Sequence, residues 1–272
     1  SHLGLITLLL GLDTELATVA AIFHIINHAT FKASLFMATG IIDHETGTRD
    51  MRKLNGMWRF MPYTATLAMV AAAAMAGVPL LNGFLSKEMF FAETLHQQVL
   101  GSMSWLIPVL ATIAGALSVA YSARFIHDVF FNGDPIDLPK QPHEPPRYMR
   151  VPIEILVVLC LLVGMFPHFA VSDILAAASY AVLGDAAPDY KLSVWHGFNL
   201  PLLMSFIATS VGVMIYVQRK HLFHFRASLP TLNAKKGFER GLYSLIKWSQ
   251  EKIKRIENGS LQRYSFVMIA VV

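Results

Sequence analysis

The chain has 272 residues, of which 54% are hydrophobic and 15% are charged, and its 22 Lys and Arg against 18 Asp and Glu give a net charge of +4. Soluble domains carry about 45–50% apolar and about 25% charged residues, so this composition excludes a disordered or fibrous chain and, with a mean hydropathy of +0.49, predicts an integral membrane protein. The single cysteine, Cys160, excludes an intramolecular disulfide and a cysteine-based metal or iron–sulfur centre.

Several apolar stretches reach the roughly 20 residues that a membrane-spanning helix needs. Because the chain begins at Ser1 and not at Met, we expect a piece of a longer polypeptide in which residues 2–11 are the truncated end of a span. The sequence predicts further spans over residues 15–42, 62–97 (broken), 105–131, 152–171 and 200–217, and the start of another in residues 259–272. No segment alternates apolar and polar residues, so we expect an all-α, polytopic transmembrane helix bundle.

The region of residues 62–97 is interrupted near its middle by four residues that disfavour a continuous helix: Gly77, Pro79, Asn82 and Gly83. The distribution of basic residues among the loops favours one membrane crossing with an interruption over a hairpin of two crossings. Only a single crossing places every basic loop on one side, which the positive-inside rule makes cytoplasmic. Irregular backbone within a membrane must be buried in protein or line a wet cavity, so the break predicts an ion path.

The segment Leu232–Ile256 differs from the spans, because its apolar residues recur at helical spacing between lysines and arginines. With Trp248, this pattern predicts an amphipathic helix on the cytoplasmic membrane surface within a separate region of residues 219–258. A basic linker that binds anionic lipid without a defined orientation is the alternative. We expect no nucleic-acid partner.

Three ionisable residues lie within the predicted span 15–42: His24, His28 and Lys32. Their spacing of four residues places them on one helix face at steps of about 6 Å. Lys32 lies about 15 Å from the nearer end of the span, too deep to reach the headgroups, and an ionisable residue at such depth is by default functional. The alternatives are two histidines that only hydrogen-bond a neighbouring helix, or a metal site, for which the glutamate of a His-Glu-x-x-His motif is missing.

Ser86, Lys87 and Glu88 follow the break by about one helical turn. The positive end of the second half-helix and the loss of water both destabilise a charged Lys87, whereas the Glu88 carboxylate stabilises it. A lysine held between such opposing influences suits a proton relay. A static ion pair of Lys87 with Glu88, or with a group on another helix, is the alternative.

Two segments carry a resemblance to a known family: HIINHATFKASLFMATGIIDHETGTRD from His24 and AGVPLLNGFLSKEMFFAE from Ala76. They resemble the large A subunit of multisubunit Mrp-type sodium/proton antiporters, which is related to the proton-pumping, antiporter-like subunits of respiratory complex I. The resemblance extends to WHGFNLPLLM from Trp195 and NGSLQRY from Asn258 and is loose in the Pro-rich linker. The complex I subunits usually carry an aromatic residue where Thr30 stands and Asp where Glu88 stands.

The resemblance implies that residues 1–218 form the C-terminal part of an antiporter-like domain. It implies that His24, His28, Lys32 and Lys87 belong to the second proton half-channel. We include Glu88 in the expected proton relay because it neighbours Lys87. The surface helix then resembles the lateral helix that braces neighbouring units, and the first half-channel lies on earlier helices that this chain lacks. The implied protein is a multi-pass subunit in the cell membrane that works with other subunits to exchange protons for sodium or another monovalent cation.

Two other functions stay open. A proton-pumping subunit of a complex I-like NADH dehydrogenase would share the path, and its partner subunits would identify it. A membrane metalloenzyme or haem protein would use His24, His28, His96 and His127, and metal analysis with an absorbance spectrum would reveal it. The leading interpretation is a transporter subunit, not an enzyme, with no cofactor and no metal.

Overall fold

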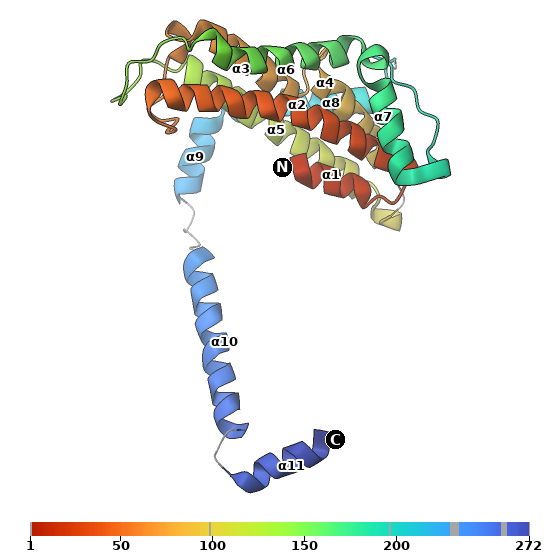
Figure 1. Ribbon diagram of the computed structural model, residues 1–272, viewed down its shortest axis with the longest axis vertical. Coiled ribbons are helices and arrows are strands. Elements are labelled where there is room, and N and C mark those ends of the chain that lie inside the picture. Colours follow the sequence, from red (N-terminus) through yellow and green to blue (C-terminus); the bar gives the residue numbers. More distant parts are fainter. Residues whose placement is uncertain (1, 98, 196, 229–233, 257–259, 272) are drawn as a thin grey trace. The chain divides into compact units, whose positions relative to one another are not determined.

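The computed structural model describes residues 2–97, 99–195, 197–228, 234–256 and 260–271. These residues form helices and connecting loops and contain no strand, which confirms the all-helical expectation. The chain divides into two compact units, Ser1–Arg219 and Lys220–Val272 (Figure 1). Five helices of the first unit are long and apolar enough to cross a membrane.

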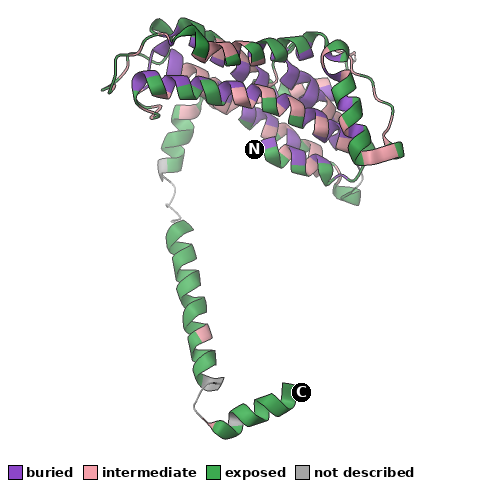
Figure 2. Ribbon diagram, in the orientation of Figure 1, coloured by how far each residue is buried: buried purple, intermediate pink, exposed green. Residues whose placement is uncertain are grey.

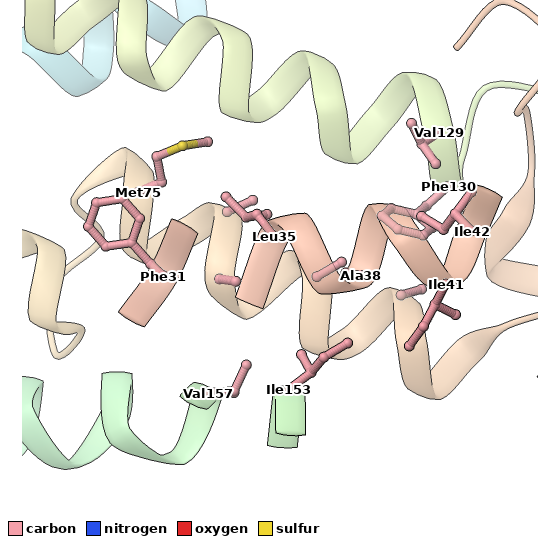
Figure 3. Packing of buried hydrophobic residues seen from close by; sticks show 14 of the residues in the cluster. Phe31, Leu35, Ala38, Ile41, Ile42, Met75, Val129, Phe130, Ile153 and Val157 are labelled. Carbon is pink, nitrogen blue, oxygen red and sulfur yellow. The ribbon is translucent and has the colours of Figure 1, made fainter. Parts of the chain in front are cut away.

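Helix α2 (Glu15–Thr46) contacts most of the other helices of the first unit. It begins where the hydroxyl of Thr14 accepts a hydrogen bond from the amide of Ala17, and it ends at Gly47 in the left-handed conformation. Its buried side chains pack against α3 (Pro62–Ala76) and α6 (Arg147–Met165). Figure 3 shows the core between them, with Leu35 and Ala38 between Met75 and Ile153.

The region of residues 62–97 forms two helices, α3 and α4 (Asn82–His96), with five residues between them. Helix α3 ends at Gly77, whose positive φ of 86° lets its amide bond the carbonyls of Ala73 and Ala74. Pro79 follows and has no amide hydrogen with which to continue the helical hydrogen bonds. The two helices stay in contact because Gly83 has no side chain: a Cβ there would lie 1.7 Å from the Ala74 oxygen.

Helices α5 (Leu106–Phe130) and α8 (Leu200–Val217) pack side by side. Small residues allow the close approach. A Cβ on Gly212 would lie 2.5 Å from the Ala116 oxygen, and one on Gly115 would lie 3.2 Å from the Cβ of Ala208. Such contacts between small residues are typical of helices that associate within membranes.

The expectation of one span over residues 152–171 needs correction. Helix α6 ends at Met165, and a separate helix, α7, occupies Pro167–Leu183. The cause is local: a residue before proline disfavours helical backbone, and Phe166 adopts φ −131° and ψ 57°, while Pro167 suits the first position of a new helix. Helix α7 runs across one end of the bundle (Figure 1) and packs on α2 and α6.

Several loops meet at one end of the first unit. The amide of Ile136 bonds the carbonyl of Lys53 at 3.1 Å, and the Glu144 carboxylate accepts the amide of Thr64 at 3.0 Å. The start of α9 (Arg219–Ser228) reaches the same end, because the Arg219 guanidinium lies 3.6 Å from the Asp128 carboxylate of α5. The C-terminal ends of α2, α5 and α8 therefore lie together with the N-terminal ends of α3 and α6.

The second unit holds α10 (Ala234–Ile256) and α11 (Leu261–Val271). The described side chains of α10 are exposed except Ser249, as Figure 2 shows. The helix occupies most of the expected Leu232–Ile256, of which Leu232 and Asn233 lie outside the described residues. Helix α11 lies within the expected start of a further span.

Candidate functional site

The row of His24, His28 and Lys32 lies on one face of α2, as its spacing predicts. His24 is 1% exposed, whereas His28 and Lys32 are partly buried. The His24 and His28 rings stack with centroids 6.3 Å apart, and the Lys32 ammonium lies 5.8 Å from the Phe36 ring centroid. The row therefore runs from the buried interior of the unit toward its surface.

Lys87 of α4 lies at the break between α3 and α4. Its side chain is 5% exposed, and its stem lies against Gly77, where a Cβ would be 2.8 Å from the lysine Cδ. The Nζ atom donates hydrogen bonds to the Ala76 carbonyl at 2.8 Å and to Ser118 Oγ at 3.2 Å. The ammonium thus caps the negative, C-terminal end of α3, a stabilising contact that reasoning from the α4 dipole alone did not include.

Glu88 has different surroundings from Lys87. Its carboxylate accepts a hydrogen bond from Asn199 at 3.4 Å and lines a cavity of about 350 Å³. Glu93, Asp189 and Lys191 line the same cavity. Neighbours in the sequence therefore contact two different regions, because consecutive helical residues point in different directions.

The remaining residues of the break hold it against α2. The Asn82 amide donates to Thr30 Oγ1 of α2 at 2.8 Å, and both Asn82 and Gly83 are buried. Gly77 provides the left-handed turn, and Pro79 lines an apolar groove beside α8. The four interrupting residues thus shape the break without charge, and Lys87 contributes the buried cation.

Three residues that the sequence analysis did not select join Lys87 to the histidine row: His2 of α1 (His2–Leu10) and Ser118 and Tyr121 of α5. His2 Nδ1 lies 3.2 Å from His24 Nε2, and His2 Nε2 lies 2.9 Å from the Tyr121 hydroxyl. The Tyr121 and Ser118 hydroxyl oxygens are 3.3 Å apart. Polar residues three apart in an apolar helix were the available signal for Ser118 and Tyr121.

The four histidines of the metal-site alternative do not form one cluster. His96 bonds the Ala92 carbonyl of its own helix at 2.7 Å, and His127 lies 3.4 Å from the Asp128 carboxylate. Within the described part of the chain, no three His, Cys, Asp or Glu side chains are arranged to hold a metal ion.

Residues 1–118 match the family described as NADH:quinone oxidoreductase/Mrp antiporter, transmembrane region. A Rhizobium meliloti protein, named as the probable A/B subunit of a K⁺/H⁺ antiporter, is 55% identical over 96% of this chain and 27% of its own length. The A subunit of the Na⁺/H⁺ antiporter from Bacillus subtilis is 38% identical over 99% of this chain and 37% of its own length. The chain thus spans about a third of these relatives.

A solved structure has the same fold. A chain in the structure of the Mrp complex from Dietzia sp. matches 100% of this chain and 29% of its own length, with a TM-score of 0.76 and 33% identity. The sequence relatives, the shared fold and the membrane-length helices agree, and the chain therefore belongs to the NADH:quinone oxidoreductase/Mrp antiporter family of membrane proteins.

Proposed function

We propose that this chain provides part of the proton path in a subunit of a monovalent cation/proton antiporter. The observation that carries the proposal is the buried ammonium of Lys87, held at a helix break beside the row of His24, His28 and Lys32. Removing an ammonium from water costs several kcal/mol, about as much as a small domain's whole margin of stability, so a buried lysine calls for a functional reason. The names of the relatives point to exchange of protons for Na⁺ or K⁺.

The proposed relay consists of His24, His28, Lys32, Lys87 and Glu88. Lys87 exchanges protons with the equally buried His24, from which His28 and Lys32 lead toward the surface of this unit. Glu88 faces the 350 Å³ cavity and is the carboxylate through which Lys87 exchanges protons with that side. No metabolite is altered, so the role is that of a transporter subunit, not that of an enzyme.

We further propose that α3 and α4 together form one discontinuous span. Each has 15 residues and is about 22 Å long at 1.5 Å per residue, short of the roughly 30 Å hydrocarbon core. The contacts between the loops after α2 and after α5 support one crossing, because they bring both loops to the same end. Helix α7 then lies across the opposite end and does not carry the chain back across the membrane.

This topology gathers basic residues of the loops and of the adjoining helix ends at the end that we assign to the cytoplasm. They are Arg49, Arg52, Lys53, Arg59, Lys140, Arg147, Arg150 and Arg219. The segments at the opposite end, between α4 and α5 and between α7 and α8, contain Lys191 as their one Lys or Arg.

The topology predicts that cysteines introduced by Arg52→Cys and Lys140→Cys react with an impermeant thiol reagent from the same, cytoplasmic face. Both native side chains are exposed, and Cys160 is fully buried, so it gives little background. Val99→Cys, on the segment between α4 and α5, should react from the other face. Labelling of Arg52→Cys and Lys140→Cys from opposite faces would contradict a single crossing by α3 and α4.

We propose that α10 lies along the cytoplasmic membrane surface as a lateral brace for neighbouring subunits. Phe238, Leu242 and Ile246 recur at spacings of four residues, and five lysines and two arginines lie elsewhere in the helix. A nitroxide at Leu242 should show low water accessibility in the assembled complex, and one at Lys247 should show high accessibility. Equal exposure of both labels would mean that the segment is an unoriented linker.

The partners in this proposal are the other subunits of a cation/proton antiporter complex, together with the lipid of the cell membrane. The test uses the native full-length complex in inverted vesicles that carry an imposed pH gradient. Addition of Na⁺ or K⁺ should move protons without any electron donor. If proton movement instead requires NADH and a quinone, the chain belongs to a redox-driven pump, and the antiporter assignment is wrong.

A further inference from the structure

The described side chains between Lys87 and His24 form a connected series of hydrogen bonds. Lys87 Nζ donates to Ser118 Oγ at 3.2 Å, and Ser118 Oγ lies 3.3 Å from the Tyr121 hydroxyl. Tyr121 lies 2.9 Å from His2 Nε2, and His2 Nδ1 lies 3.2 Å from His24 Nε2. The series passes through α5 and α1, and none of its three middle residues belongs to the relay proposed above.

One arrangement of donors and acceptors satisfies all of these contacts with neutral rings. In this arrangement Ser86 Oγ donates to the Gly83 carbonyl and accepts from His24 Nδ1, which lies 3.1 Å away. A neutral imidazole has one donor and one acceptor nitrogen, so His24 Nε2 accepts the proton of His2 Nδ1. His2 Nε2 is then an acceptor, and Tyr121 donates its hydroxyl proton to it. Every donor from Tyr121 to Ser86 therefore points the same way.

Ser118 is the point at which this series opens or closes. Its single hydroxyl hydrogen has two acceptors, the Met75 carbonyl at 3.1 Å and the Tyr121 oxygen at 3.3 Å. When the hydrogen points to Met75, Tyr121 receives no proton, and the series is interrupted. When it points to Tyr121, the donors run without a gap from Lys87 to His24. Rotation of one buried hydroxyl thus switches the connection.

We propose that Ser118, Tyr121 and His2 carry the proton between Lys87 and His24, with the Ser118 hydroxyl as the gate. The inference rests on the proposed transport function and names the route within it. The Lys87 ammonium gives a proton to Ser118 Oγ, the Ser118 proton moves to Tyr121, the Tyr121 proton moves to His2 Nε2, and the His2 Nδ1 proton moves to His24 Nε2. Lys87 ends as a neutral amine and His24 as an imidazolium, while each middle residue keeps its number of protons.

The proton step also requires a reset, because His2 changes tautomer and the hydroxyls reverse direction. Each must turn back before the next proton follows the same route. The buried position of Ser118, 2% exposed, keeps bulk water from replacing its hydroxyl during this cycle. A series of hydrogen bonds of this kind transfers one proton and must then reorient, which suits exchange in discrete steps.

The test compares Ser118→Thr with Ser118→Val in the full-length complex. The two new side chains have nearly the same shape and differ in the hydroxyl, so any steric disturbance is shared. We expect the Thr variant to keep cation-driven proton flux within about threefold of the unaltered complex. The Val variant should lose at least about tenfold in maximal flux, with little change in the cation concentration at half-maximal rate. Equal flux in the two variants would overturn the role of Ser118.

Tyr121→Phe tests the next link, and Tyr148→Phe is its matched control because Tyr148 is 90% exposed. The first should lower maximal flux by at least about tenfold, and the second should leave it unchanged. Lys87→Ala separates the two proposals. If Lys87→Ala stops transport while Tyr121→Phe and Ser118→Val do not, the route is wrong and the transport function stands. If Lys87→Ala transports normally, the proposed function itself fails.

Discussion

Replacement of Lys87 by alanine is expected to lower cation-dependent proton flux by about a hundredfold or more, the lower range of what a positioned proton-transfer group contributes. The variant should still assemble, because the site loses one side chain and its two hydrogen bonds while every backbone–backbone hydrogen bond stays. Alanine removes the hydrogen bonds to the Ala76 carbonyl and to Ser118 Oγ, so the break loses the group that we propose as its proton donor. The measurement is proton flux in inverted vesicles at matched levels of assembled complex.

Lys87→Arg distinguishes a relay from a structural cation at the same position. Arginine keeps the positive charge and can cap the C-terminal carbonyls of α3, but its guanidinium does not release a proton in proteins. A relay therefore fails with arginine, whereas a static ion pair or helix cap tolerates it. Near-normal flux in this variant would leave Lys87 with a purely structural role. Lys140→Ala, in an exposed loop, is the matched lysine control and should transport normally.

The local parts of the site were predictable because they follow from spacing within one segment. Residues four apart share a helix face, which was enough to group His24, His28 and Lys32. Gly77 and Pro79 indicated the break through backbone preferences that hold in any context. The single cysteine and the charge of the loops required no structure at all. These predictions rest on rules that relate residues within about one helical turn.

The missing parts of the site depend on contacts between distant segments. His2 and Tyr121 are 119 residues apart, and no periodicity within either helix indicates that their side chains meet. Sequence reasoning placed Lys87 near the positive end of α4, but the ammonium also lies on the negative end of α3, which only the packing of the break reveals. The start of α7 has a local signal in Pro167, but the continuous hydropathy of residues 152–171 favours a single span in a prediction from sequence.

Gly83→Ala is expected to prevent assembly of the site, although the change adds only one methyl group and alanine favours a helix more than glycine does. The new Cβ would lie 1.7 Å from the Ala74 oxygen and 2.7 Å from the Ala74 carbonyl carbon. Both are backbone atoms of the last turns of α3, so no side-chain rotation relieves the overlap. Overpacking of a well-packed interior costs roughly 1–3 kcal/mol even where side chains can shift, and here the α3 and α4 ends must separate. That separation would pull the Ala76 carbonyl away from Lys87.

Gly40→Ala is the matched control, because Gly40 lies within α2 and a Cβ there meets no atom within 4 Å. The same change of residue should be neutral or slightly stabilising at that position, since alanine favours a helix over glycine by about 1 kcal/mol. The amount of assembled complex after detergent extraction, with its thermal stability, measures both variants. Equal stability of the two would mean that α3 and α4 do not meet at Gly83. The close contact between α3 and α4, and with it the placement of Lys87 between them, would then be wrong.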